Sequence, residues 1–195
     1  SKFLSKKEFS LQDFFEIGNT FHENGELDQA ETVFRRILEL VPEHPGALHF
    51  LGVIARQCGH LESAIKLIKK AVEVSPHYHT AYNNLGQTYA ELGDTNKAKE
   101  AYIRAVKENP DYAKAHFNLG LMAAKKGKFK EAIDHLNTSA TLDPCETRTH
   151  YEIGAIYSKE GKKYNAQIAF RTVLELEKDH VDARCFLGEI IMSIA

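Results

Sequence analysis

Two observations in the sequence predict an all-α protein made of repeated pairs of antiparallel helices. The first is the stretch 81–110, AYNNLGQTYAELGDTNKAKEAYIRAVKENP, in which apolar and small residues recur at helical spacing on both sides of Gly93. The second is that the pattern returns every 34 residues along the chain. Neither helix has an apolar stripe wide enough to form a core alone, so the pairs must stack on one another.

Four series of residues share this 34-residue period. A glycine recurs inside each first helix, at Gly18, Gly52, Gly86, Gly120, Gly154 and Gly188. An alanine recurs in each second helix, at Ala30, Ala64, Ala98, Ala132 and Ala166. Further glycines mark the turns, at Gly25, Gly59, Gly93, Gly127 and Gly161, and prolines mark the ends of the pairs, at Pro42, Pro76, Pro110 and Pro144. A helical glycine costs about 1 kcal/mol relative to alanine, so its recurrence indicates close approach of the second helix.

These residues resemble the tetratricopeptide repeat (TPR) family, whose 34-residue unit reads aromatic-x2-Leu-Gly-x2-Tyr, Ala-x3-Phe, Pro. The best match is the third unit, with Tyr82, Leu85, Gly86, Tyr89, Ala98, Tyr102, Ala105 and Pro110. The resemblance covers about residues 11–195 and implies a right-handed superhelical solenoid whose first helices line a concave side. It implies little about function, because the signature residues hold helices together and do no chemistry.

Taken in order, residues 1–10 are an N-terminal segment, either a capping helix for the array or an unstructured tail, and residues 11–195 are the repeat domain. Ser10 followed by Asp13 resembles a capping box and predicts a helix start near Leu11. The expected repeats span 11–44, 45–78, 79–112, 113–146 and 147–180, followed by a terminal helix at 181–195.

The fifth repeat departs from the pattern because Lys178 stands where the other repeats have proline. Since proline is a helix-stopping device, we expect a longer or less sharply bent junction before the terminal helix.

Composition and charge limit the classes of function. The formal charge of −2 gives no electrostatic reason to expect nucleic acid. No apolar run approaches the length of about 18 residues that inserts into a membrane. The cysteines Cys58, Cys145 and Cys185 form no CxxC pair and favour reduced structural thiols in a cytoplasmic protein.

Motifs for chemistry are missing from the sequence. It contains no phosphate loop, nucleophile elbow or HExxH motif, and the closest histidine pair, His77 and His79, makes a poor metal site. His116 and His150 replace aromatic residues at a helix-packing position, which favours a packing role. We therefore expect no enzymatic activity, no cofactor and no metal.

The resemblance places the second, fifth, sixth, ninth and twelfth residues of each repeat on the concave face, where a peptide would bind. Asn84 and Asn118 occupy the same position in successive repeats, and each carboxamide offers a donor and an acceptor to an extended backbone. The alternative interpretation is that they are ordinary polar residues in a solvated groove. The candidate peptide-binding residues are His49, Phe50, Arg56, Asn83, Asn84, Gln87, Lys114, Phe117, Asn118, Arg148 and Tyr151.

The charges on this face favour a neutral-to-acidic partner segment, because positive residues outnumber negative ones by three. The residues counted are Arg56, Lys114, Lys125, Arg148 and Lys159 against Glu91 and Glu152.

Three hypotheses for function remain. The preferred one is an interaction module or adaptor that binds an extended peptide segment of a partner protein. The second is a scaffold that assembles with itself through the apolar ends at 3–9 and 190–194. The third is a substrate-recruiting arm of a larger enzyme such as a glycosyltransferase, because the two asparagines resemble part of the asparagine ladder of that type of array.

Overall fold

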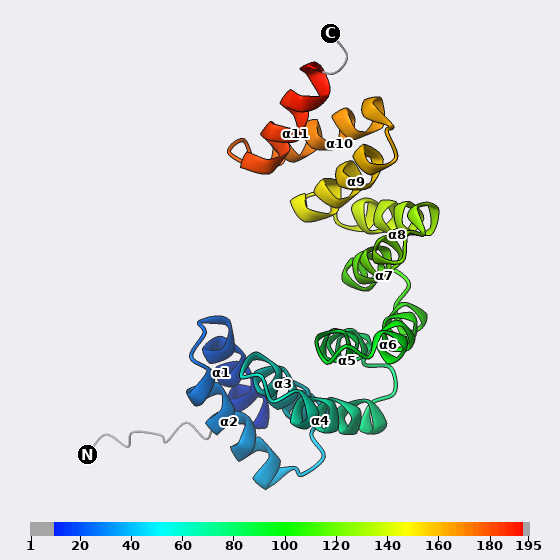
Figure 1. Ribbon diagram of the computed structural model, residues 1–195. Helices are drawn as coiled ribbons and strands as arrows, with labels where there is room; N and C mark the ends of the chain where they lie inside the picture. Colours follow the sequence, from blue (N-terminus) through cyan, green and yellow to red (C-terminus); the bar gives the residue numbers. More distant parts are fainter. Residues whose placement is uncertain (1–9, 193–195) are drawn as a thin grey trace, which may run out of the picture. The chain divides into compact units, whose positions relative to one another are not determined.

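The computed structural model describes residues 10–192, which form eleven α-helices and no strand (Figure 1). Each helix has 12 to 14 residues, too short to be stable alone in water, so its stability must come from packing. The helices are α1 (Leu11–Glu23), α2 (Leu27–Leu40), α3 (Pro45–Gln57), α4 (Leu61–Val74), α5 (His79–Glu91), α6 (Thr95–Glu108), α7 (Ala113–Lys125), α8 (Phe129–Leu142), α9 (Thr147–Lys159), α10 (Lys163–Leu176) and α11 (Val181–Met192).

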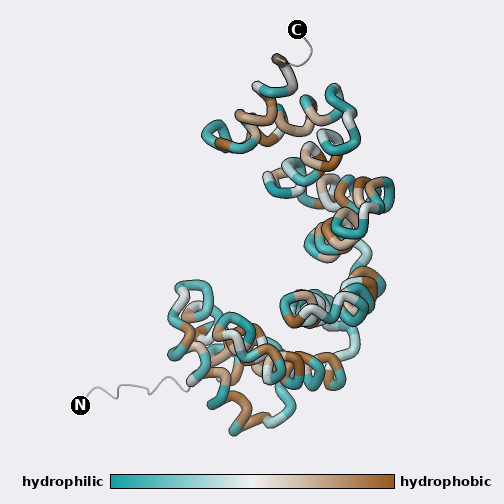
Figure 2. The backbone as a smooth tube through the Cα atoms, viewed as in Figure 1, coloured by the Kyte–Doolittle hydropathy of each residue, from teal (hydrophilic) through white to brown (hydrophobic). Residues whose placement is uncertain are grey.

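The helices fall into two compact units that divide within α6, between Ala101 and Tyr102. We call them the amino-terminal unit and the carboxy-terminal unit and describe each by itself. In the first, α1 packs on α2, α3 on α4, and α4 on α5; in the second, α7 packs on α8, α9 on α10, and α10 on α11. Figure 2 shows hydrophilic and hydrophobic residues alternating along the helices, as expected for elements that bury only one side.

The alanine series lies in the core, because all five of its members are fully buried. Four residues after each alanine stands a larger side chain that is also buried: Phe34, Ile68, Tyr102, Leu136 and Phe170. Four of these side chains meet the glycine of the paired first helix. A Cβ added to Gly52 would lie 2.5 Å from Cγ1 of Ile68, and one added to Gly154 would lie 2.8 Å from Cε1 of Phe170. The predicted close approach is therefore confirmed at Gly18, Gly52, Gly120 and Gly154.

The second glycine series forms the turns within the helix pairs, as predicted. All five glycines have positive φ angles, from 70° at Gly161 to 88° at Gly93. This left-handed backbone is costly for residues with a Cβ, so glycine is required there for its conformation and not for packing space.

The start of α1 confirms the predicted capping box. The Oγ of Ser10 accepts a hydrogen bond from the backbone N–H of Asp13 at 3.1 Å, and Oδ2 of Asp13 accepts one from the backbone N–H of Ser10 at 2.7 Å. The self-assembly hypothesis uses the two apolar ends, which lie outside the described part of the chain: residues 3–9, residues 193–194 and the side chains of 190 and 191.

The prediction of a longer or less bent junction at Lys178 is wrong. Residues 177–180 join α10 to α11, just as residues 75–78 join α4 to α5, and the first residue of each junction has nearly the same backbone angles. The guanidinium of Arg184 supplies a substitute for proline, because its Nη2 donates to the carbonyl oxygen of Lys178 at 2.6 Å. The backbone hydrogen bond across the junction is also kept, from the N–H of His180 to the carbonyl oxygen of Glu177 at 3.2 Å, as from Tyr78 to Ser75 at 3.1 Å.

The two kinds of helical glycine environment give a stability prediction. We expect Gly154→Ala to lower the free energy of unfolding by about 1–3 kcal/mol, because the new methyl group would collide with the buried Phe170 ring. Gly188 holds the same place in α11, where an added Cβ meets nothing within 4 Å. Gly188→Ala should therefore raise stability by up to about 1 kcal/mol through helix propensity. Urea unfolding of both variants checks this, and equal effects would contradict the packing argument.

Candidate functional site

The candidate site is the face of the first helices that carries the second, fifth, sixth, ninth and twelfth residues of each repeat, together with the thirteenth. The thirteenth residue follows the second by about three helical turns and so lies on the same side of the helix; Glu91, Lys125 and Lys159 hold this place. We call this face the first-helix face. In the amino-terminal unit it belongs to α1, α3 and α5, and in the carboxy-terminal unit to α7 and α9.

A chain of hydrogen bonds centred on His49 crosses the first-helix face of the amino-terminal unit. His49 comes from α3 and is 4% exposed. Its Nδ1 lies 3.0 Å from the hydroxyl oxygen of Tyr78, in the turn before α5, and its Nε2 lies 2.7 Å from Nδ2 of Asn84 in α5. The His49 and Tyr78 rings also pack edge to face at 4.8 Å. Residues from two successive repeats are thereby tied together.

Burial makes His49 neutral at physiological pH. Loss of solvent, together with the nearby His22, lowers the pKa of the His49 imidazole to about 4. Burial also raises the pKa of the Tyr78 phenol, which a hydrogen bond from Thr80 partly offsets. The group that links Tyr78 to Asn84 is therefore an uncharged imidazole with one N–H and one lone pair.

The three predicted residues of α5 differ in accessibility. Asn83 is only 2% exposed, so its carboxamide belongs to the interior and offers little to a ligand. Asn84 and Gln87 are half-buried and keep part of their side chains at the surface. The fifth position faces the packed side of the helix here, so burial removes Asn83 from the set that a peptide could contact.

Phe50 lies in an aromatic cluster rather than free on the face. Its ring stacks on Phe34 at 5.1 Å and 10°, and it also meets Phe15 at 5.8 Å and His22 at 5.4 Å. Phe50 remains half-buried, so one side of the cluster borders the surface.

Arg56, predicted as a free positive charge, is paired. Its Nη1 lies 2.6 Å from Oε1 of Glu91, which joins α3 to the end of α5. Among the described residues, buried polar atoms without a hydrogen-bond partner include the Nε of Arg56, Oδ1 of Asn19 and Nε2 of His22. All three belong to α1 or α3. This face is therefore polar and has no surplus of positive charge, because Arg56 is paired and Glu16 is an exposed carboxylate at the sixth position of the first repeat.

The carboxy-terminal unit presents a different surface. Lys114 and Arg148 are exposed, whereas Phe117, Asn118 and Tyr151 are half-buried. The guanidinium of Arg148, at the start of α9, lies over the ring of Phe117, in α7, at 5.3 Å. Tyr151 packs on His180 and Phe170 at 5.1 and 5.8 Å. The structure thus brings Phe117 and Arg148 together, whereas Tyr151 packs on rings of its own repeat and meets Phe186 of α11 at 6.3 Å.

Four positive side chains on this face have no ion-pair partner within the described residues. They are Lys114, Lys125, Arg148 and Lys159, and all four are exposed. Some other charged residues of the unit are paired, such as Lys128 with Glu131 at 3.2 Å, whereas Lys130 and Arg171, on the second helices, have no ion pair within the described residues. The positive surplus predicted from the sequence therefore belongs to the carboxy-terminal unit alone.

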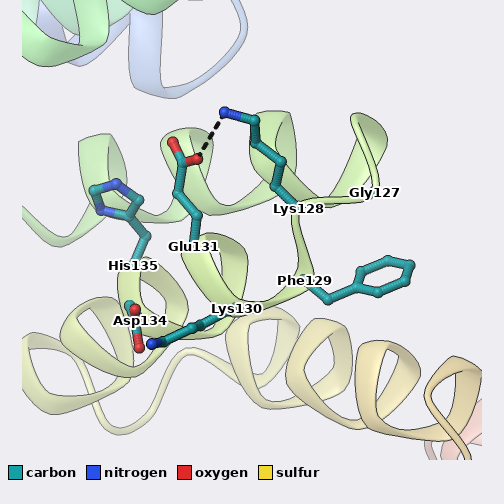
Figure 3. Close-up of a pocket in the computed structure, with 7 residues that line it drawn as sticks. All are labelled: Gly127, Lys128, Phe129, Lys130, Glu131, Asp134 and His135. Atoms are coloured by element: carbon teal, nitrogen blue, oxygen red, sulfur yellow. Dashed lines mark hydrogen bonds and ion pairs between the residues drawn. The ribbon is translucent and has the colours of Figure 1, made fainter.

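An open depression of about 610 Å³ lies elsewhere, at the turn before α8 and the first turns of that helix (Figure 3). Figure 3 shows the side chains of Lys128 and Glu131 paired on one side of it and Phe129 pointing away. None of the predicted site residues lines it. Its walls are mostly charged side chains of a single helix, without a converging set of groups for chemistry.

Packing explains two of the histidines. The Nε2 of His116 donates to the carbonyl oxygen of Pro110 at 2.9 Å, and that of His150 donates to the carbonyl oxygen of Pro144 at 3.0 Å. Both rings are half-buried and tie a first helix to the preceding turn, as expected for packing residues.

The described residues contain no group of three or more His, Cys, Asp or Glu side chains arranged to hold a metal ion. They also include no helix that combines the length and the apolar character needed to cross a membrane. The three cysteines are free, but all are exposed, so the expectation that they are structural is wrong.

The geometry and the repeats agree with the comparisons to known proteins. Models described as tetratricopeptide repeat match residues 83–144 and residues 14–44 and 147–180, and one described as TPR repeat matches residues 52–93. The chain belongs to the tetratricopeptide repeat family. Membership supports a protein-interaction module, and repeats of this family are generally not catalytic.

Solved structures of TPR proteins resemble the chain over most of its length. MamA is 27% identical, with a TM-score of 0.71, covering 85% of this chain and 97% of that one. A TPR protein from Thermus thermophilus, TTC0263, is 24% identical, with a TM-score of 0.74, covering 94% and 100%. YrrB, described as a TPR protein with an unusual peptide-binding site, is 21% identical, with a TM-score of 0.66, covering 89% and 90%. At under 25% identity the last two likenesses show the fold alone. None of the curated proteins compared matches the chain.

Sequence reasoning missed Tyr78, because this last residue of a repeat is not among the five concave positions. A signal was present in the spacing. The fifth residue of a repeat and the residue 29 positions later are both rings in three cases: Phe15 with His44, His49 with Tyr78, and Tyr151 with His180. Only the His49 pair also carries a hydroxyl facing an imidazole nitrogen, which identifies it as a polar link.

The lowered pKa of His49 gives a pH prediction. Since the folded state holds the imidazole at a pKa of about 4, below its ordinary 6.5, the unfolded chain binds more protons between these values. The stabilising contribution is complete above pH 6.5 and is lost as pH falls toward 4. We expect the free energy of unfolding to drop by about 2 kcal/mol from pH 7 to pH 5 because of this residue.

Urea titrations at several pH values test this expectation on His49→Phe and His60→Gln. His60 is exposed and makes no capping bond with its side chain, so its variant should keep the pH slope. An unchanged slope in His49→Phe would show that His49 is not the group responsible.

Proposed function

We propose that this TPR chain is an interaction module that binds an extended, neutral-to-acidic segment of a partner protein on its first-helix faces. The observation that carries the proposal is the set of four exposed and unpaired positive side chains on the first-helix face of the carboxy-terminal unit.

The charge distribution supports an acidic partner segment. A lysine alone at a surface is well solvated and needs no partner. Here, however, Lys114, Lys125, Arg148 and Lys159 belong to two helices of one unit, and Glu152 is the one acidic residue in the predicted set there. Like charges gathered on one face repel one another and attract an anionic segment from solution.

Aromatic groups beside these charges support binding of side chains as well as charge. Phe117 and Arg148 form one amphipathic surface, with a half-buried ring beneath an exposed guanidinium. An acidic side chain can pair with the guanidinium while an adjacent apolar side chain covers the ring. Rings with a polar partner are frequent anchors in protein interfaces.

The amino-terminal unit contributes polar recognition without a surplus of positive charge. Its Arg56 is neutralised by Glu91. Among the predicted residues of α5, Asn84 and Gln87 have the most accessible polar side chains. Carboxamides can exchange hydrogen bonds with the backbone of an extended segment, independently of its sequence. We assign Asn84 and Asn118 this backbone-holding role.

A charge-reversal experiment tests the electrostatic part of the proposal. The full chain is immobilised and a random peptide library is selected on it. We expect the selected peptides to be enriched in Asp and Glu, and Lys114→Glu with Arg148→Glu to weaken their binding at least about tenfold, an effect that salt reduces.

The matched control is Lys130→Glu with Arg171→Glu. These residues are also exposed and lie in the same unit, but on the second helices α8 and α10. Peptides that bind both double variants equally well would refute recognition by the first-helix face.

The backbone-holding role of the two asparagines gives a separate prediction. The double variant Asn84→Ala, Asn118→Ala should bind the selected peptides several-fold more weakly while its circular dichroism spectrum stays near that of the parent. Its urea midpoint should fall, because Asn84→Ala leaves the buried Nε2 of His49 without its partner. Calorimetry gives the affinities. Retained affinity would remove the backbone-holding role and leave the asparagines as ordinary solvated residues.

A further inference from the structure

We infer that His49 and Tyr78 are positioning residues that turn the Asn84 carboxamide so that its Oδ1 accepts a backbone N–H of the bound segment. This inference rests on the proposed function and specifies the chemistry of its amino-terminal unit. It predicts a partner segment that is extended and has an unsubstituted peptide nitrogen at this contact.

The hydrogen-bond chain through His49 has one direction at a time. A neutral imidazole carries its proton on one nitrogen, so one ring nitrogen donates and the other accepts. Nδ2 of Asn84 can only donate, which makes Nε2 of His49 the acceptor at 2.7 Å. The proton is then on Nδ1, which donates to the Tyr78 hydroxyl oxygen at 3.0 Å.

The opposite arrangement would reverse every bond of the chain. Tyr78 would donate to Nδ1, the proton would move to Nε2, and Asn84 would have to turn Oδ1 toward the ring. The tautomer of the His49 imidazole therefore determines the orientation of the Asn84 carboxamide, and neither can change without the other. Because the ring is 4% exposed, water cannot substitute for either partner without opening the packing.

The structure leaves Oδ1 of Asn84 as the open acceptor. Its Nδ2 is engaged by His49, and its backbone carbonyl accepts from Oγ1 of Thr88 at 2.7 Å. Within the described residues Oδ1 has no hydrogen-bond partner, and it is not among the enclosed atoms. The side chain is half-buried, so this oxygen remains within reach of a ligand.

An oriented acceptor selects a class of partner. An extended backbone offers an N–H at every residue except proline. A segment with proline or an N-methylated residue at the contact would leave Oδ1 unpaired and bring a carbon substituent against it. Side-chain identity at the same residue matters less, because the contact is with the backbone.

Protonation would reverse the site. A doubly protonated His49 donates from both nitrogens, so Asn84 would turn Oδ1 inward and present a donor in its place. The titratable groups that face His49 are His22 from α1 and Tyr78 from the turn before α5, and the ring also contacts Phe50 and Asn84. Burial lowers the pKa of His49 to about 4, so the site keeps its acceptor near neutral pH.

The first arm of the test needs no ligand. Nitrogen-15 NMR of the full chain at pH 7 should show a protonated Nδ1 and an unprotonated Nε2 for His49. It should also show a scalar coupling between Nδ2 of Asn84 and Nε2 of His49 across their hydrogen bond. A protonated Nε2 would overturn the inference whatever the chain binds.

The second arm uses one peptide selected from the random library and its single-site N-methylated forms. We expect methylation of one nitrogen to weaken binding to the parent chain about tenfold or more, and Asn84→Ala to abolish that difference. Binding should also weaken as pH falls from 7 toward 4. If peptides bind but no methylation is sensitive to Asn84, this inference fails and the proposed function stands. If the library yields no binder, both fail.

Tyr78→Phe tests positioning separately from contact. Without the hydroxyl, a buried Nδ1–H has no acceptor, so the ring should favour the Nε2–H tautomer and turn Asn84. We expect loss of the internitrogen coupling, several-fold weaker peptide binding and a smaller methylation penalty, with an unchanged circular dichroism spectrum. Tyr112→Phe is the control. Tyr112 is also the last residue of a repeat and also has a half-buried side chain, but the fifth residue of its repeat is Asn83 and not a histidine. Equal losses in both variants would show a structural role only and overturn the inference.

Discussion

The contact on which the structure depends is the approach of the second helix to the glycine at the eighth position of its first helix, as at Gly18, Gly52, Gly120 and Gly154. At Gly154 no Cβ could be added without moving the fully buried ring of Phe170. The lost helix propensity, about 1 kcal/mol per glycine, is offset by the dispersion and burial that the ring gains. Each of these pairs therefore has one preferred helix spacing, and within one unit the side chains on neighbouring first helices are held at defined positions.

That fixed spacing is what permits a polar chain in the interior. His49 and Asn84 are 35 residues apart in sequence, yet their side chains meet at 2.7 Å. A buried imidazole with one missing partner would cost stability, because an unsatisfied polar group loses its hydration without compensation. The apolar packing of the pairs thus comes first, and the polar chain depends on it. The carboxy-terminal unit has the same scaffold, but Phe117 and Arg148 place a ring and a cation on its face.

The repeat period predicted the fold well and the site less well, for a physical reason. Period and residue size determine which positions face inward, so the alanine series and the turn glycines could be placed from sequence. Depth and pairing depend on side chains from the next repeat, which a one-dimensional pattern does not rank. Asn83 is therefore buried, Arg56 is neutralised by Glu91, and Tyr78 was missed. The junction at Lys178 shows the same limit. The missing proline predicted a changed junction, whereas the pattern could not show that Arg184 donates to the Lys178 carbonyl there.

The residue at the fifth position shows where packing alone ceases to explain the chain. Phe15 and Tyr151 fill this position in other repeats and pack on a ring 29 residues later without needing a protonation state. An aromatic side chain at position 49 would fill similar space. It would also avoid the loss of stability in acid that His49 causes. A histidine adds two directional hydrogen bonds, one of which sets the orientation of a side chain that reaches the surface. A local departure from the most stable choice is typical of functional positions. The proposed recognition role gives a physical reason for an imidazole at this place that packing alone does not give.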